Sequence, residues 1–98
     1  MSTLHLLNES PYKGTSLTSA LLFATLDDAL LLTGDAVYAL QKNTAPYQLL
    51  AKSQLPIFVL QEDLQARHLE NSLVNSKIID YQEFVELSTF HNKVVSWL

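Results

Sequence analysis

The sequence predicts a single α/β domain over residues 1–98, a three-layer fold in which a mainly parallel sheet of about five strands is flanked by helices. Two observations predict this class. Residues 29–32 are four consecutive apolar residues, the pattern of a strand covered on both faces rather than the alternation of a half-exposed one. Thr33-Gly34-Asp35 follows at once and indicates a sharp turn into a helix. A chain of 98 residues is long enough to bury one core and too short for two.

The first strand is expected over Thr3–Leu7. It ends at Asn8-Glu9-Ser10-Pro11, because a proline cannot extend the hydrogen-bond ladder. His5 lies inside this strand, where a lone histidine is expected to be packed or hydrogen-bonded rather than a metal ligand.

The first helix is predicted to begin at Gly14-Thr15-Ser16 and to run to about Thr25. Leu22 and Phe23 point away from its apolar arc, so they contact either another part of the core or a second chain. The residues that share the arc, at helical spacing, are Leu17, Ala20, Leu21 and Ala24.

Asp27 and Asp28 come between this helix and the central strand. We expect them to form a solvated turn, because consecutive side chains diverge and no histidine partner is close in the sequence. After the strand, Asp35 is expected to cap a helix that runs from about Ala36 to Gln41 or Lys42. A second short helical piece is expected over residues 47–52.

The second half of the chain repeats the alternation of strand and helix. A third strand is expected over residues 55–60, followed by a helix with Gln61-Glu62-Asp63 in its first turn and an end near Arg67-His68-Leu69. A short fourth strand is expected at Lys77-Ile78-Ile79. The next segment, Asp80-Tyr81-Gln82-Glu83, fits a capping box that starts a helix continuing to His91.

Two aromatic residues near the end of the chain have no obvious core role. Phe90 falls on the polar side of the last helix, so it either covers a loop or contacts a partner. Residues 93–98 are expected to form a last short strand, and Trp97 within it either packs internally or docks on another chain, since aromatic residues are enriched in interface cores.

Composition excludes several classes of function. The net charge is −4, and the six basic residues are spread singly, so we expect no direct binding to nucleic acid. There is no cysteine, which removes disulfides, thiolate metal sites and persulfide chemistry on this chain. No apolar run is long enough for a membrane span, and nothing resembles a signal peptide, so a cytoplasmic location is expected.

Catalytic equipment is sparse as well. The only glycines are Gly14 and Gly34, so no glycine-rich phosphate loop exists, and the three histidines are far apart. Glu62 and Asp63 follow a strand, where a catalytic acid could lie, but no base or nucleophile accompanies them. We therefore predict no catalytic residue, no metal site and no cofactor.

Four segments carry a more specific signal through their order and spacing. They are Asn8-Glu9-Ser10-Pro11, the Leu30-Leu31-Leu32 strand with its Gly-Asp turn and Val37-Tyr38-Ala39, residues 59–67, and residues 80–87 continuing to His91 and Trp97. With these segments the chain resembles, over nearly its whole length, the DsrH/TusB family of sulfur-relay proteins. Two positions depart from the family pattern. Gly34-Asp35-Ala36 stands where the family has Asp-Gly-Val, and His68 stands where it has glycine and must tolerate a left-handed helix end.

The resemblance implies a DsrE-like fold and assembly with TusC-like and TusD-like homologous subunits into a heterohexamer. In such a complex, persulfide sulfur passes to a TusE-like acceptor for 2-thiolation of the wobble uridine of tRNA. The family's reactive cysteines correspond here to Leu60-Gln61, aligned with the TusD-like partner, and to Ala20, aligned with DsrH proteins of sulfur oxidisers.

Our leading hypothesis is a non-catalytic subunit of a cytoplasmic sulfur-relay complex. Its candidates for partner contact are Leu22, Phe23, Phe90 and Trp97. The alternatives are a DsrH-like subunit of a sulfur-oxidation complex and an independent small-ligand module that uses a crevice beside Gly34 and Glu62. A hydrolase built on Asp63 or His91 is a more distant alternative.

Overall fold

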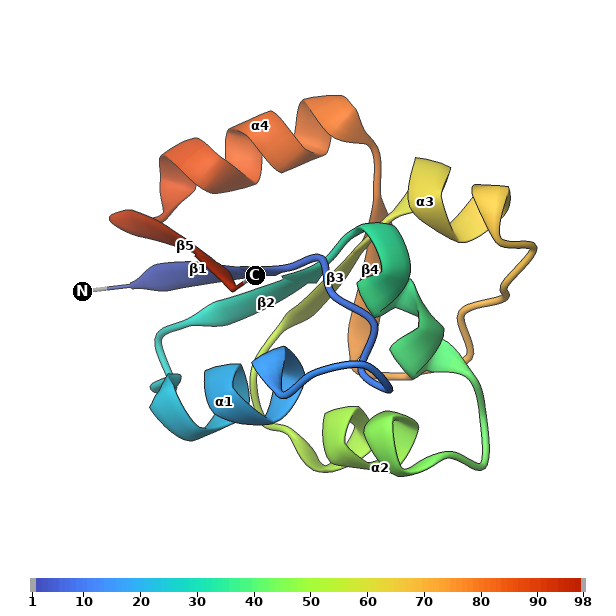
Figure 1. Cartoon of the computed structure of the whole chain (residues 1–98). Helices are drawn as coiled ribbons and strands as arrows, with labels where there is room; N and C mark the ends of the chain where they lie inside the picture. Colours follow the sequence, from blue (N-terminus) through green and yellow to red (C-terminus); the bar gives the residue numbers. More distant parts are fainter. Residues whose placement is uncertain (1, 98) are drawn as a thin grey trace.

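The computed structural model of the protein describes residues 2–97 (Figure 1). The strands are β1 (Thr3–Leu7), β2 (Ala29–Leu32), β3 (Ile57–Leu60), β4 (Ser76–Ile79) and β5 (Lys93–Trp97). The helices are α1 (Ser16–Phe23), the 3₁₀ helix η1 (Gly34–Leu40), α2 (Ala45–Lys52), α3 (Gln61–Ala66) and α4 (Tyr81–Phe90). The last strand was expected to include Leu98, which lies outside the described residues.

The five strands form one parallel sheet in the order β4-β3-β2-β1-β5. From β1 to β4, each strand is added on the same side of the one before it. The connection through α4 then returns across the sheet and places β5 beside β1. Because parallel crossovers are right-handed, α1 and α2 lie on one face and α4 lies on the other (Figure 1). The predicted α/β class, with a sheet flanked by helices, is confirmed.

The central strand β2 is buried on both faces, as predicted. Leu30 and Leu32 pack in the larger core cluster, with residues of α1, η1 and α2. Ala29 and Leu31 pack in a smaller cluster on the opposite face, against Phe84 of α4 among others. No helix within residues 2–97 has the length and apolar character needed to cross a lipid bilayer.

The turn after β2 differs from the expectation in two ways. The helix is a 3₁₀ helix that already begins at Gly34, not an α-helix from Ala36. Asp35 does not cap it, so that prediction is wrong. The carboxylate of Asp63 in α3 accepts the Gly34 N–H instead, at 2.7 Å. Gly34 has a φ of +51°, which L side chains rarely adopt.

The other helix ends follow local rules. The α2 helix begins at Ala45, two residues before the predicted start, because Thr44 caps it through the Tyr47 N–H. The capping box of α4 is present as predicted. The Glu83 N–H donates to Asp80 at 2.8 Å, and the Asp80 N–H donates to Glu83 at 3.2 Å.

Replacing Gly34 with alanine tests the turn. The new Cβ would meet the Asn8 side chain at a positive φ, so we expect Gly34→Ala to lower the free energy of unfolding by about 1–2 kcal/mol. Urea unfolding measures this. In Gly14→Ala the new Cβ meets only the flexible Glu9 carboxylate and no positive φ is involved, so that control should lose less. Equal losses would contradict the role assigned to Gly34.

Candidate functional site

Three of the four predicted contact residues lie on the α1 side of the sheet. Leu22 and Phe23 are in the last turn of α1 and are 85% and 72% exposed. The Phe23 ring lies 5.8 Å from the partly buried Trp97 ring at the end of β5. The structure thus joins Phe23 and Trp97 in one aromatic pair, with Leu22 on the adjacent outer side of the helix. We call these three residues the α1 surface.

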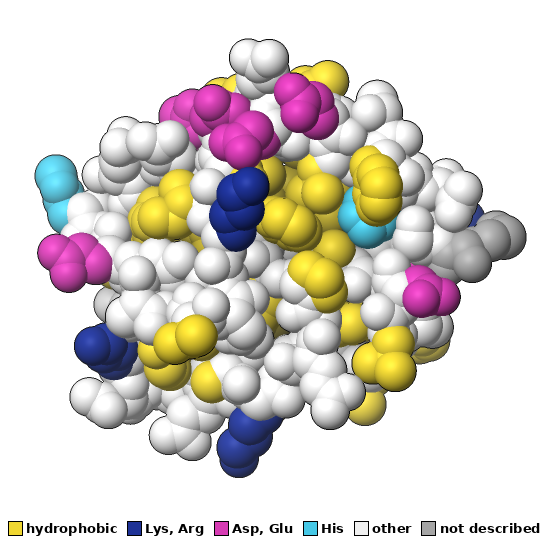
Figure 2. Space-filling model, turned by 180° about the vertical axis from the view of Figure 1, so that it is seen from behind, with side chains coloured by type: hydrophobic (Ala, Val, Ile, Leu, Met, Phe, Trp, Pro, Cys, Tyr) yellow, Lys and Arg dark blue, Asp and Glu magenta, His cyan; other side chains and the backbone are white. Residues whose placement is uncertain are grey.

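Phe90 lies elsewhere. It ends α4 on the opposite face of the sheet and is 79% exposed. It lines a hollow of about 270 Å³ that also includes Phe58, Ile79 and Leu87. This hollow lies between α4 and the strands β3 and β4. Figure 2 shows this side, with hydrophobic side chains in the middle and acidic side chains gathered above them. The molecule therefore exposes two separate apolar surfaces.

A buried chain of hydrogen bonds holds Trp97 in place. The indole Nε1–H donates to Nδ1 of His5 at 3.0 Å, and Nε2 of His5 lies 2.9 Å from Oδ2 of Asp28. An indole N–H can only donate, so Nδ1 of His5 must accept and the ring proton must sit on Nε2. His5 then donates to the Asp28 carboxylate. The chain links β1, the residue before β2 and the end of β5.

Asp28 is the anionic end of this chain. Its carboxylate also accepts the backbone N–H groups of Thr25 at 3.0 Å and Thr3 at 2.9 Å. Burial opposes ionisation, but the hydrogen bonds from Thr25, His5 and Thr3 outweigh it and lower the pKa of Asp28 to about 2. Asp28 is therefore a charged, structural carboxylate at pH 7.

The solvated turn expected at Asp27 and Asp28 is correct only for Asp27, which is exposed. For Asp28 the expectation is wrong, because this residue is buried and bonded to His5. The parallel register pairs Leu4 with Ala29 and so places Asp28 beside Thr3 at the start of β1. That juxtaposition comes from strand pairing and cannot be read from local sequence. His5 is hydrogen-bonded, as expected.

The carboxyl ends of the strands, where α/β folds usually place ligands, are occupied by ion pairs. Arg67 donates to Asp35 from Nε at 3.1 Å and from Nη2 at 2.9 Å. It also donates to the Asp63 carbonyl at 3.0 Å and lies 5.8 Å from the Tyr38 ring centre. The Asp63 carboxylate is committed to the Gly34 N–H. Arg67, Asp35 and Asp63 are therefore bound to one another or to the backbone.

The remaining acid and base candidates do not come together. Glu62 is exposed on α3, and Asp63 lies at the same edge of the sheet. His91 lies at the opposite edge, between α4 and β5. Its Nδ1 is buried without a hydrogen-bond partner among residues 2–97, and burial lowers the pKa of His91 although the nearby Asp28 charge raises it. Within the same residues, no three His, Asp or Glu side chains are placed to hold a metal ion.

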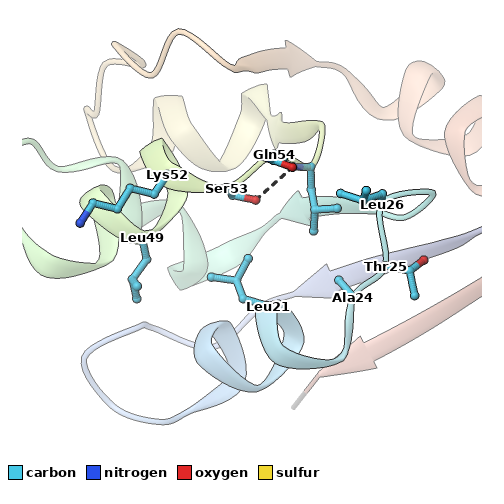
Figure 3. Close-up of a pocket in the computed structure, with 9 residues that line it drawn as sticks. Leu21, Ala24, Thr25, Leu26, Leu49, Lys52, Ser53 and Gln54 are labelled. Atoms are coloured by element: carbon cyan, nitrogen blue, oxygen red, sulfur yellow. Dashed lines mark hydrogen bonds between the residues drawn. The ribbon is translucent and has the colours of Figure 1, made fainter.

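The larger hollow lies at the amino ends of the strands, between α1 and α2 (Figure 3). It has a volume of about 430 Å³. Leu21 from α1 and Leu49 from α2 lie on its two sides, and Leu26 and Leu55 also line it. This hollow is on the side of the molecule away from Gly34 and Glu62, where the small-ligand alternative placed its crevice.

Comparison with known proteins decides the family. The family model for DsrH-like proteins matches residues 9–94. This chain belongs to the DsrH family. Its relatives include Protein TusB of Yersinia enterocolitica serotype O:8, 35% identical over 91 residues that cover 92% of this chain and 95% of that protein. Protein TusB of Yersinia pestis strain Pestoides F is 34% identical over 95 residues, covering 96% and 99%.

The fold is shared with a solved structure. The crystal structure of the ychN protein from E. coli superposes with a TM-score of 0.76 at 19% identity, covering 98% of this chain and 99% of that one. The resemblance to the DsrH/TusB family that the sequence motifs indicate is confirmed, and the chain is a member of a sulfur-relay family.

One departure from the DsrH family pattern can be followed in detail. His68 has a φ of +54°, so it adopts the left-handed conformation that glycine usually takes at a helix end. Its N–H donates to the Gln65 carbonyl at 3.1 Å, and the Leu69 N–H donates to the Leu64 carbonyl at 3.2 Å. This is a Schellman ending, with Leu69 and Leu64 in the same core cluster. The helix end is preserved without glycine.

The Asp28 carboxylate makes stability depend on pH. Its pKa is about 2 in the folded protein, against an ordinary value of 3.8, so its contribution is complete above pH 3.8 and is lost as the pH falls toward 2. The shift corresponds to about 2 kcal/mol. We expect Asp28→Asn to lower the free energy of unfolding at pH 7 by about this amount and to remove this part of the acid loss.

Urea unfolding between pH 7 and pH 2 measures both effects. Asp27→Asn, at the exposed neighbouring residue, is the control and should reproduce the native curve. Identical curves for the two variants would show that Asp28 has no special role. His91 adds a separate loss of stability as the pH falls below its ordinary pKa of 6.5, because burial lowers the pKa of His91 in the folded state and the unfolded state binds the proton more readily.

Proposed function

We propose that this chain is a non-catalytic subunit of a cytoplasmic sulfur-relay complex that passes persulfide sulfur toward 2-thiolation of the tRNA wobble uridine. The observation that carries the proposal is the combination of a DsrH family sequence with the absence of cysteine from all 98 residues. Relatives named Protein TusB support the branch of the family that we choose.

Sulfur relay consists of thiol exchange. The thiolate of an acceptor attacks the outer sulfur of a persulfide, the sulfur–sulfur bond of the donor breaks, and the donor leaves as a thiolate. Both partners need a cysteine, and this chain has none. The positions that the family resemblance aligns with reactive cysteines are Leu60-Gln61 and Ala20, and Ala20 is completely buried against the sheet. The reactive thiols therefore belong to partner subunits.

The groups at the carboxyl ends of the strands support a structural role. Asp35 and Asp63 are both engaged by Arg67 or by the Gly34 amide, so neither of these two carboxylates is free to act as a base. The exposed apolar residues are then the remaining candidates for a functional contact. We propose that Leu22, Phe23 and Trp97 on one face, and Phe90 on the other, contact TusC-like and TusD-like subunits in a heterohexamer that serves a TusE-like acceptor.

The reducing cytoplasm suits this role, because free thiols and persulfides persist there. The two exposed apolar surfaces suit it too, since large apolar side chains at the surface are typical of contact sites. In this arrangement, the chain shapes or stabilises a site whose chemistry its partners supply.

Co-expression with the subunits encoded beside its gene tests the proposal. Native mass spectrometry should show a stable hetero-oligomer containing this chain, and persulfide labelling should mark the partners only. We expect Leu22→Ser or Phe90→Ser to weaken assembly about tenfold or more, as removal of an interface anchor does. Because Leu22 and Phe90 lie on opposite faces of the sheet, comparing the two variants shows how much each face contributes to assembly.

Val74→Ser is the matched control, since Val74 is 98% exposed in the loop before β4 and belongs to neither surface. The proposal is overturned if the chain stays monomeric beside its partners, or if the pure chain alone transfers sulfur.

A further inference from the structure

The groove between α1 and α2 is a third apolar feature, separate from the proposed contact residues. At one end is the 430 Å³ hollow lined by Leu21, Leu26 and Leu55. At the other is a hollow of about 330 Å³ lined by Pro11, Tyr12, Leu17 and Pro46. Leu49 lines both hollows, so they lie next to each other along α2.

The two helices that form this groove are parallel. The first turns of α1 and α2 meet at the smaller hollow, and their last turns meet at the larger one. Each helix has eight residues, which gives a groove about 12 Å long. That length accommodates about two turns of an α-helix. A helix seated there could place two or three apolar anchors along Leu17, Leu21 and Leu49.

The charged residues within the segments that form the groove are all lysines. Between Ser10 and Leu26 the only charged residue is Lys13, and between Ala36 and Gln61 the only charged residues are Lys42 and Lys52. No Asp or Glu of residues 2–97 lines either hollow.

The three lysines differ in how close they lie to the groove. Lys52 lines the larger hollow and extends outward from α2 in Figure 3. Lys42 lies with Lys52 on a neighbouring hollow of α2, and Lys13 lies between two residues of the smaller hollow.

Acidic side chains lie at the margins or on the other side. The nearest in sequence are Glu9, which accepts the Ser16 hydroxyl at 2.9 Å, and the exposed Asp27. The segment 62–86 instead carries most of the acidic residues of the chain, against two basic ones, Arg67 and Lys77. The acidic residues of that segment are Glu62, Asp63, Glu70, Asp80, Glu83 and Glu86.

We propose that the α1–α2 groove binds an acidic amphipathic helix of a partner protein. Its apolar residues fill the two hollows, and its Asp and Glu side chains face the lysines on the rim. The inference rests on the proposed function, because a relay subunit must contact protein partners, and it adds the place and the chemistry of one such contact.

Other occupants fit less well. A nucleic acid would meet three separate lysines, no arginine and a chain with a net charge of −4, which is a poor match to a polyanion. A lipid surface requires a dense basic rim around exposed apolar residues, and Lys13, Lys42 and Lys52 are dispersed. The chain's own α4 is acidic and exposes Val85 and Phe90, so a second copy is the nearest rival.

Photo-crosslinking in the organism that encodes this chain tests the proposal. Benzoylphenylalanine is placed at Leu49, which is 40% exposed between the two hollows, and at Val74 as the matched control. Mass spectrometry then identifies the crosslinked peptide. We expect Leu49, and not Val74, to give a peptide of another protein with net negative charge and apolar residues at helical spacing.

Charge reversal is the second measurement. Lys52→Glu should lower the Leu49 crosslink about threefold to fivefold, while Lys93→Glu, in the edge strand β5, should leave it unchanged. A Leu49 yield no higher than that of Val74 overturns the proposal. So do a neutral or basic peptide, an RNA or lipid adduct, and a peptide from residues 81–90 of a second copy.

The two proposals fail in distinguishable ways. If native mass spectrometry shows the hetero-oligomer and Leu49 gives no specific crosslink, only the groove assignment is wrong. If Leu49 crosslinks to an acidic helix and no hetero-oligomer with the sulfur-relay subunits forms, the proposed function is wrong.

Discussion

The hydrogen-bond chain from Asp28 through His5 to Trp97 is the interaction on which the rest of the structure depends. A buried carboxylate is costly unless donors satisfy it, and Asp28 has three of them, from Thr3, Thr25 and His5. The chain therefore connects the turn after α1, the first strand and the last strand. It also fixes the His5 tautomer and the position of Trp97, so a buried charge at one edge of the sheet determines where an aromatic ring lies near the surface.

The contacts at the strand ends explain why this α/β fold presents few candidate catalytic residues. In such folds the carboxyl ends of the strands usually hold the ligand, but here Arg67, Asp35, Asp63 and the Gly34 amide bind one another. These contacts stabilise the turn after β2 and leave the surfaces to carry the function. The single return crossover through α4 leaves one sheet face half covered, and the parallel pair α1 and α2 leaves a groove on the other. Both features suit a chain that works by contact.

The sequence predicts much of the fold because local rules decide it. Four apolar residues in β2 require cover on both faces, and Asp80 with Glu83 caps α4 through side chains three residues apart. The errors arise where distant segments meet. Asp28 looks like a solvated turn until the parallel register places it beside Thr3 and His5. Asp35 looks like a cap until Asp63, 29 residues from Gly34, takes that amide instead. The pairing of Phe23 with Trp97 depends on β5 lying next to β1, which no local pattern shows.

A double-mutant cycle between Asp28 and Trp97 tests the central claim most directly. The free energy of unfolding is measured by urea titration at pH 7 for the native chain, Asp28→Asn, Trp97→Phe and the double variant. If Asp28 holds Trp97 through His5, the two losses are not additive, and the coupling energy is about 1 kcal/mol or more. Losses that add to within about 0.3 kcal/mol would show that the two residues act independently and would contradict the account.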